Sequence, residues 1–463
     1  MTQYIRNQFN DKIVCLVACL MLLTCEDFIE VDSPRGQISK EVVFEDESTV
    51  NAAVSTVYAK LRDEVLLTGN LYGMNVLMGF YSDEVDYYSD INSDIYPFYS
   101  HEIIANNSVV NTVWSGGYEV IYMTNLLLEG IEDSTGLNST IKEELKGELL
   151  FLRALAHFYL VNLFNDIPYI ETTDYLINQD VARISKDLVY DHILEDLLQA
   201  KLLLESADVS GERIRANGFV VSAFLARIYL YLERWEDAVN ESSLIINTTD
   251  LFHLESVEDA FLKNSSSAIL QLKPKNAGDN TNEAISFYFI FGPPYLMSLN
   301  PSLVSSFEAS DLRLQHWIRT VTNGSENWYA PFKYKQIENT GTSLEYSIVF
   351  RLAEQYLIRS EARMRLGNTE LAEQDLNIVR ARAGLEAYAG LSTVELSNAI
   401  LEERRHELFT EFGHRWFDLK RFGEAENVLI NVKPNWQSRD HWLPIPELEL
   451  LMNPNLLPQN TGY

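Results

Sequence analysis

Phe350–Val379 reads FRLAEQYLIRSEARMRLGNTELAEQDLNIV. This stretch decides the fold, because its pattern is repeated in Gly218–Ile246, which reads GFVVSAFLARIYLYLERWEDAVNESSLII. Each stretch carries Ala-x-x-Tyr-Leu on a first helix, then a short break, then an alanine early in a second helix. The break is Gly367-Asn368 in one stretch and Glu233-Arg234-Trp235 in the other. Two helices joined by a turn over about 30 residues are typical of a tetratricopeptide-like repeat, in which small side chains let the paired helices approach closely. Two unrelated helical hairpins are the alternative.

The remaining chain extends this prediction. Ile141–Glu205 is a looser third copy of the helical unit. By contrast, Gly69–Asn107 and Lys273–Gly341 are rich in aromatic, Asn, Ser, Gly and Pro residues without a steady period, and such long irregular segments usually carry function. A short strand is expected near Ala268–Lys273. The predicted fold is therefore mainly all-α, a tetratricopeptide-like helical-hairpin scaffold with long irregular loop excursions and a few short strands.

The composition is that of a folded and strongly acidic protein. The 463 residues are 46% hydrophobic and 22% charged, and 36 Lys and Arg against 67 Asp and Glu give a formal net charge of −31. A surface this acidic repels phosphate backbones, so no nucleic-acid partner is expected. The same repulsion disfavours polyanionic ligands, unless a basic pocket offsets it.

The N-terminus resembles a lipoprotein export signal. Arg6 and Lys12 precede an apolar run, Ile13–Thr24, that is too short to span a bilayer but suits the hydrophobic region of a signal peptide. The run ends at Leu22-Leu23-Thr24-Cys25, which resembles a lipobox, although Thr stands where Gly, Ala or Ser is usual. Cleavage there would make Cys25 the acylated first residue. A short buried N-terminal helix is the alternative.

The cysteine content agrees with this interpretation. The only cysteines are Cys15, Cys19 and Cys25, and the first two fall inside the proposed signal. The mature chain would hold one thiol, consumed by lipid, and no disulfide. We therefore expect a signal peptide over residues 1–24, a tether over 25–45 and a single domain over 46–463. That domain would have an N-terminal part at about 46–260 and a C-terminal part at about 261–463.

Several sequence blocks, in order along residues 25–463, resemble those of the SusD/RagB family. The blocks include Cys25 followed by Glu26-Asp27-Phe28-Ile29-Glu30; Trp114-x3-Tyr118; Gly147-Glu148-Leu149-Leu150-Phe151-Leu152-Arg153-Ala154; Asp311-x-Arg313; Arg351-Leu352-Ala353-Glu354; Gly413-His414-Arg415-Trp416-Phe417-Asp418; and Gln459-Asn460-x-Gly462-Tyr463. One such block would be weak, whereas the ordered set is highly specific. Asn165 departs from the family pattern, which often has Gly in that turn.

The resemblance implies a mostly helical fold on a tetratricopeptide-like scaffold. It also implies an outer-membrane lipoprotein, lipid-anchored and exposed on the bacterial surface, whose partner is a SusC-like TonB-dependent transporter that it covers as a lid. Family members mostly bind oligosaccharides or polysaccharides, and some take other nutrients such as peptides. The expected function is therefore capture of a glycan and its delivery to the transporter. Neutral glucans or mannans fit the acidic charge of the chain better than sulfated or uronate polymers.

Charged residues set into apolar helices allow two interpretations. They could form a catalytic or ligand-binding constellation, or they could be paired ions that fix one helix to another. We expect the second, since such pairs commonly join repeat helices. The residues concerned are Glu148, Arg153, Glu354, Arg359, Glu361, Arg380, Arg382, Glu403, Arg404, Glu407 and Arg415.

The enzyme signatures are absent or incomplete. His406-Glu407 begins an H-E-x-x-H motif, but Thr410 stands where the second His is required, and no G-x-S-x-G, Walker or dinucleotide-binding motif occurs. We expect a non-enzymatic binding protein without a cofactor. Three alternatives stay open: capture of peptide or another nutrient, a two-carboxylate glycosidase, and a repeat scaffold for protein assembly only.

An acidic run provides the best metal candidates. Carboxylates at alternate positions can converge on calcium, which points to Asp86, Asp90 and Asp94. The run fails the EF-hand pattern, because Ile95 occupies the glycine position and His101 that of the bidentate Glu. We therefore expect a solvated acidic loop and no metal site.

The irregular excursions carry the chemistry that sugar binding needs. Pyranose C–H groups pack on Tyr or Trp rings, while amide and carboxylate groups bond the hydroxyls. The candidates for a glycan platform are Trp328, Tyr87, Tyr88, Tyr96, Tyr295, Tyr288, Tyr329, Asp83, Asn92 and Asn282. Trp436 is a further candidate outside these segments. Rings that instead fill the core beneath the loops are expected at Phe287, Phe289, Phe291 and Trp317.

Overall fold

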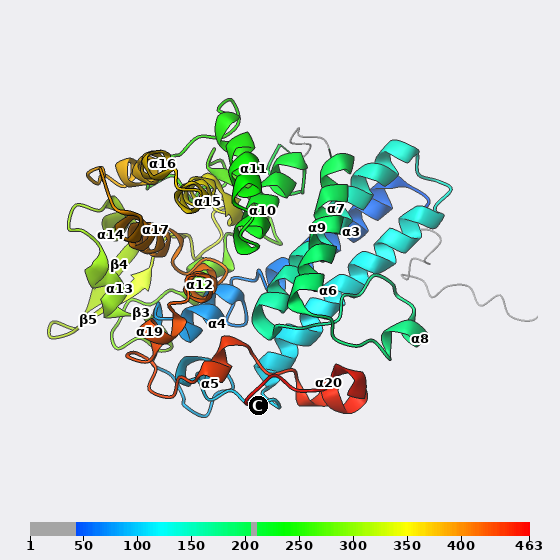
Figure 1. Ribbon diagram of the computed structural model, residues 1–463, viewed down its shortest axis with the longest axis horizontal. Coiled ribbons are helices and arrows are strands. Elements are labelled where there is room, and N and C mark those ends of the chain that lie inside the picture. The colour runs from blue at the N-terminus through cyan, green and yellow to red at the C-terminus, as the bar shows by residue number, and fades with distance from the viewer. Residues whose placement is uncertain (1–42, 205–210) are drawn as a thin grey trace, which may run out of the picture. The chain divides into compact units, whose positions relative to one another are not determined.

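The structure is a computed structural model that describes residues 43–204 and 211–463 (Figure 1). The predicted signal peptide, Cys25 and the predicted tether up to residue 42 lie outside the described residues. From Phe44 to Tyr463 the chain forms one unit by its internal contacts.

Helices dominate the described residues. The helices of the first half are α3 (Glu47–Asp63), α4 (Met74–Tyr81), α5 (Tyr96–Ser100), α6 (Ser108–Asp133), α7 (Ser139–Phe164), α8 (Tyr175–Asn178), α9 (Lys186–Leu203), α10 (Gly218–Tyr231) and α11 (Trp235–Asn247). Those of the second half are α12 (Asn282–Ser286), α13 (Pro301–Ser306), α14 (Leu312–His316), α15 (Leu352–Arg365), α16 (Thr369–Arg382), α17 (Thr393–Leu408), α18 (His414–Arg421), α19 (Ala425–Leu429) and α20 (Glu447–Met452), with the short 3₁₀ helices η1 (Ser438–His441) and η2 (Pro454–Leu456).

The predicted repeats are confirmed as two helical hairpins, α10–α11 and α15–α16. A residue with positive φ turns the chain at each predicted break, Glu233 (φ 57°) in the first hairpin and Gly367 (φ 82°) in the second. The shared alanines are buried between the paired helices, where a larger side chain would separate them. Helix α11 packs against α15, so the two hairpins lie side by side (Figure 1).

Helix α7 lies at the centre of the N-terminal helices. Its residues 147–164 are all buried, and it packs against both α6 and α9. Within the described part of the chain, α7 alone is long and apolar enough to cross a membrane, but its apolar window is wholly enclosed by the fold, as in a core helix. The looser third copy that was predicted over Ile141–Glu205 is thus a pair of helices, α7 and α9, whose connection contains α8.

Among residues 43–204 and 211–463, six short strands form three separate two-stranded antiparallel sheets. The strands are β1 (Val85–Tyr87), β2 (Ala268–Leu272), β3 (Met297–Leu299), β4 (Ile318–Thr322), β5 (Asn327–Pro331) and β6 (Ser347–Arg351), paired as β1–β3, β2–β6 and β4–β5. Strand β2 confirms the strand expected near Ala268–Lys273. Strand β6 runs directly into α15, which fixes the second hairpin to this sheet.

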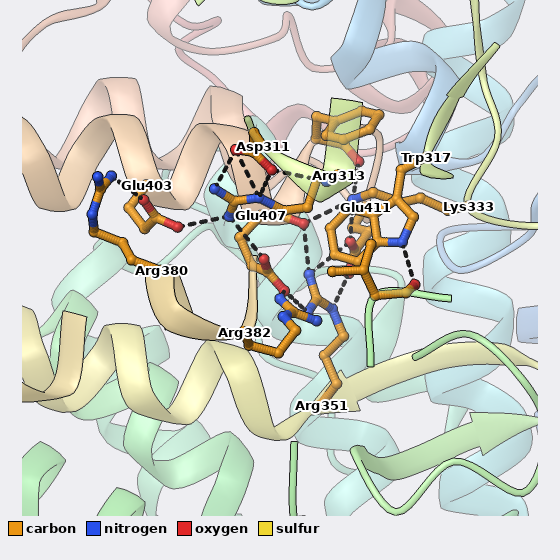
Figure 2. Close-up of polar contacts among 12 residues, drawn as sticks. Asp311, Arg313, Trp317, Lys333, Arg351, Arg380, Arg382, Glu403, Glu407 and Glu411 are labelled. Carbon is orange, nitrogen blue, oxygen red and sulfur yellow. Dashed lines mark hydrogen bonds and ion pairs between the residues drawn. The ribbon is translucent and has the colours of Figure 1, made fainter. Parts of the chain in front are cut away.

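A buried ionic cluster centred on Glu407 joins the C-terminal elements (Figure 2). The Glu407 carboxylate accepts hydrogen bonds from Arg313 at 3.0 Å and from Arg351 and Arg382. Arg313 also pairs with Glu403 at 2.7 Å, and all of these side chains are buried. Burial alone would raise the pKa of Glu407, but the surrounding guanidinium groups lower it well below its usual value. The cluster therefore ties α14, β6, α16 and α17 together.

Ion pairs elsewhere confirm the structural interpretation of the helix charges. Arg227 of α10 pairs with Glu354 of α15 at 2.6 Å, and Arg153 of α7 pairs with Asp196 of α9 at 2.6 Å. Each bond joins two helices that pack against each other. The other predicted residues are also in ion pairs, although Arg215 and Asp83 lie in loops: Glu148–Arg215, Arg359–Asp375, Glu361–Arg421, Arg380–Glu403, Arg404–Asp418 and Arg415–Asp83.

Candidate functional site

The two irregular excursions meet in space. Strand β1 comes from the first and pairs with β3 from the second, and the Tyr88 N–H donates to the Leu296 carbonyl at 2.8 Å. The Ser298 hydroxyl in turn bonds the backbone N–H and carbonyl of Tyr329 at 2.9 and 3.1 Å, which fixes β5 beside β3. Aromatic residues some 200 positions apart in sequence are therefore held on one part of the surface.

Four rings in this region are open to solvent, and we call them the aromatic platform: Tyr88, Tyr288, Phe291 and Tyr295. Tyr295 is 87% exposed, and Tyr88, which directly follows β1, is hydrogen-bonded to Leu296, the next residue after Tyr295. The Arg319 guanidinium lies 4.8 Å from the centre of the Tyr288 ring and donates to the Phe289 carbonyl at 2.5 Å, so it holds the loop and the ring together. Exposed flat rings beside polar groups can receive the apolar face of a sugar.

A second set of rings supports β1 from its own excursion. Tyr87 contacts Tyr96 and Phe80 with ring centres 5.4 Å apart in each case, and it stacks on Tyr99 at 6.2 Å. The Lys433 ammonium lies 3.8 Å from the centre of the Tyr99 ring. Burial lowers the pKa of Lys433 to about 7 and raises that of Tyr99 to about 12. Tyr87 and Tyr96, like Tyr329, are half-buried, so they are less open to solvent than the rings of the aromatic platform.

Trp328 does not offer an open face, and its predicted exposure is wrong. Its side chain is only 6% exposed, because the backbone of Gly292 lies against the ring. A Cβ added at Gly292 would lie 1.9 Å from a ring carbon, so glycine is needed for this close approach. Trp328 therefore supports the 287–296 loop from beneath and presents no open face.

Replacing Trp328 by Ala is expected to lower the free energy of unfolding by about 3 kcal/mol, because the substitution leaves a cavity under this loop. Chemical denaturation of both proteins measures the difference. The matched control is Tyr295→Ala, whose ring is exposed and whose stability should stay within about 0.5 kcal/mol of the parent. Equal stability of the Trp328→Ala protein and the parent would contradict the buried position.

Asp83 is also misplaced by the sequence-based prediction. Its carboxylate is buried and pairs with Arg415 at 2.7 Å and with Arg405 at 2.8 Å. Burial would raise the pKa of Asp83, but the two arginines lower it below its usual value. Asp83 thus belongs to the internal ion pairs and cannot contact a ligand at the surface.

The predicted amides are placed differently from each other. Asn92 is exposed in the first excursion, Gly69–Asn107, and its side chain donates to the Asp90 carboxylate at 2.9 Å. Asn282 begins α12 and lines a cavity of about 270 Å³ whose other walls carry polar and aliphatic side chains but no aromatic ring. Asn282 therefore lines a cavity that contains none of the platform rings.

The metal candidates do not converge. Asp86 accepts from the Asn300 amide at 2.8 Å, whereas Asp94 accepts from the Ser108 hydroxyl. Within residues 43–204 and 211–463, no group of three or more His, Cys, Asp or Glu side chains is arranged to hold a metal ion. The carboxylates of this run instead stabilise the loop and its neighbours.

Phe291 was missed by the sequence reasoning, which assigned it to the core. It is 78% exposed, while Phe287 and Trp317 are buried as expected and Phe289 is half-buried. The Gly292-Pro293-Pro294 run that follows Phe291 could have indicated a surface position, because Gly and Pro mark turns and loops. Trp436, in contrast, is buried against Trp416 and His101, so its candidacy as a surface ring is wrong.

Two family models match the sequence. One, described as "Starch-binding associating with outer membrane", matches residues 27–230, and a SusD family model matches residues 315–463. Two curated relatives from Formosa agariphila, "SusD-like protein P25" and "SusD-like protein P2", are 25% and 27% identical. Each alignment spans 98% of this chain and 100% or 99% of the relative.

Solved structures share the fold. A SusD superfamily protein from Bacteroides vulgatus has a TM-score of 0.80 at 23% identity, covering 91% of this chain and 100% of that one. A laminarin-binding SusD-like protein has a TM-score of 0.76 at 23% identity, with 91% and 100% covered. Surface glycan-binding protein A from Bacteroides thetaiotaomicron, in complex with laminarihexaose, has a TM-score of 0.73 at 18% identity, with 89% and 99% covered. With the ordered sequence blocks and the helical-hairpin scaffold, these matches show that the chain belongs to the SusD/RagB family.

Proposed function

We propose that this chain is a cell-surface glycan-binding protein whose ligand lies against the aromatic platform. The observation that carries the proposal is the β1–β3 pairing, which brings Tyr88 beside the loop that holds Tyr288 and Tyr295. Open rings on both sides of this pairing suit a chain of pyranose units, each of which has an apolar face. The laminarin and laminarihexaose named for two proteins of the same fold support this ligand class.

A neutral polysaccharide fits the platform better than a charged one. Asp90, Asp94 and Glu326 are exposed on the two excursions and would repel sulfate or uronate groups. The Arg319 guanidinium, which lies over the Tyr288 ring, already donates to the Phe289 carbonyl. We therefore propose neutral glucans as the ligand class.

The cellular role that we propose follows the family. The chain would be anchored in the outer membrane through lipid on Cys25, exposed at the surface, and would deliver its glycan to a SusC-like TonB-dependent transporter. We propose binding without catalysis. Peptide capture by the same architecture is the second candidate, because flat aromatic rings also accept apolar side chains.

Affinity electrophoresis through gels that contain soluble polysaccharides tests the proposal. We expect laminarin or another neutral glucan to retard the protein, and alginate to leave its migration unchanged. If no polysaccharide retards it while a peptide mixture does, the glycan proposal is wrong. Product analysis after long incubation tests the absence of catalysis, since shortened chains would show a glycosidase.

A further inference from the structure

An exposed apolar surface lies on α8 and α20, and it shares no residue with the aromatic platform. On α20, Leu448, Leu451 and Met452 occupy positions i, i+3 and i+4, so they form one helical face. That face is exposed, with Leu451 at 72% and Met452 at 73%. On α8, Tyr175 and Leu176 are each 72% exposed, and Ile177 is also exposed.

These helices border one hollow. A cavity of about 290 Å³ is lined by Tyr122 of α6, Tyr175 of α8 and Met452 of α20, with Trp114 and Tyr118 among its other walls. Figure 1 shows α8 and α20 projecting on the same side of the fold. We call this hollow and the exposed residues of α8 and α20 the α8–α20 surface. An open apolar area of this kind usually marks an interaction site.

The α8–α20 surface is held in place by the scaffold. The Asn453 amide donates to the Val181 carbonyl and the Asn455 amide to the Asp180 carbonyl, both at 2.8 Å. On the other side, Glu129 of α6 accepts from the Thr173 backbone N–H at 2.7 Å. Because these bonds fix both short helices before any partner arrives, docking would require little further ordering.

The charge around the surface selects the kind of partner. Residues 168–182 and 445–459, which carry α8 and α20, contain no Lys or Arg, and the adjacent Arg183 is bound to the Asp166 and Pro458 carbonyls and to the Asn460 side chain. Their acidic residues are Glu171, Asp174, Asp180, Glu447 and Glu449, of which all but Glu449 are exposed. An acidic rim repels a second copy of this acidic chain and an anionic bilayer, whereas it attracts Lys and Arg.

We propose that the α8–α20 surface docks a protein partner that presents an apolar ridge flanked by Lys and Arg side chains. The ridge enters the hollow beside Tyr122 and Tyr175, and the basic side chains meet the acidic rim. An apolar centre with a complementary charged rim is the usual arrangement of a specific interface. The proposal is independent of glycan binding, since it uses different helices.

A synthetic amphipathic helical peptide of about 20 residues, with Leu on one face and Lys on the other, is the probe. Its binding to the full chain is measured by fluorescence anisotropy for the parent and for Leu451→Asp, Leu176→Asp and Leu202→Asp. Leu202 is 87% exposed on α9, so Leu202→Asp is the matched control. All three substitutions add one negative charge, so general attraction to the cationic peptide is kept or increased.

We expect Leu451→Asp and Leu176→Asp to weaken peptide binding at least about tenfold and Leu202→Asp to leave it within about twofold. Equal binding by all variants, or no binding by the parent, overturns the proposal.

Two further assays address other occupants of the α8–α20 surface. Co-flotation of the parent with phosphatidylcholine or phosphatidylglycerol vesicles, lost in Leu451→Asp, would assign the surface to a bilayer instead. A concentration-dependent dimer in sedimentation, lost in the same variant, would assign it to a second copy.

Discussion

Replacing Glu407 by Gln is expected to lower the free energy of unfolding by about 3–5 kcal/mol, because it removes the central carboxylate of the buried ionic cluster. Arg382 would then lose its carboxylate partner, while Arg351 keeps Glu411 and Arg313 keeps Asp311 and Glu403. Buried guanidinium groups without a matching anion carry an uncompensated desolvation cost. Urea unfolding followed by circular dichroism measures the loss.

Glu370→Gln is the matched control, since Glu370 is an exposed carboxylate on α16. Its free energy of unfolding should change by less than about 0.5 kcal/mol.

The pH dependence of the free energy of unfolding gives a second readout. The folded pKa of Glu407 lies below the reference value of 4.5, so its stabilising contribution is present above that pH and is lost as the pH falls through the folded pKa. The difference between parent and Glu407→Gln should therefore shrink on acidification. Loss of less than about 1 kcal/mol at neutral pH would contradict a structural role for the cluster.

The double substitution Tyr88→Ala with Tyr295→Ala is expected to weaken glucan binding about 100-fold, or ~2.7 kcal/mol, because it removes one exposed ring on each side of the β1–β3 pairing. Isothermal titration calorimetry with a soluble glucan oligosaccharide measures the affinity. The melting temperature should stay close to that of the parent, since both rings are exposed.

Tyr175→Ala is the control for this experiment, because Tyr175 is an exposed tyrosine on α8 and lies outside the aromatic platform. Its glucan affinity should equal that of the parent. If the double variant binds as tightly as the parent while the parent does bind glucan, the ligand lies elsewhere on the surface. That result would refute the platform without refuting the proposed glycan function.

The sequence could predict the scaffold because its signals are local. The Ala-x-x-Tyr-Leu pattern and the following break lie within about 30 residues, and the helix period decides which face is buried. The charges on those helices were interpreted correctly for a related reason. Glu354 and Arg153 lie among apolar neighbours, and a charge in such a place requires a partner.

The platform could be predicted only in part, because exposure of a loop ring depends on contacts distant in sequence. Tyr88, Tyr288 and Tyr295 are open as the prediction requires, but Trp328 is covered by Gly292 and Asp83 is paired with Arg415, some 330 positions away. Phe291 shows the opposite error. No periodicity in an irregular segment distinguishes a ring that supports the loop from one that faces solvent.

The loop between α12 and β3 is fastened at both ends, by the buried Glu283 that accepts from the Asn75 amide at 3.1 Å and by the pairing of β3 with β1. It also lies between the two regions matched by family models, residues 27–230 and 315–463. No residue of the two helical hairpins or of the ionic cluster lies in this loop. The ligand preference that we propose could therefore be altered through this short span alone, with the scaffold kept as it is.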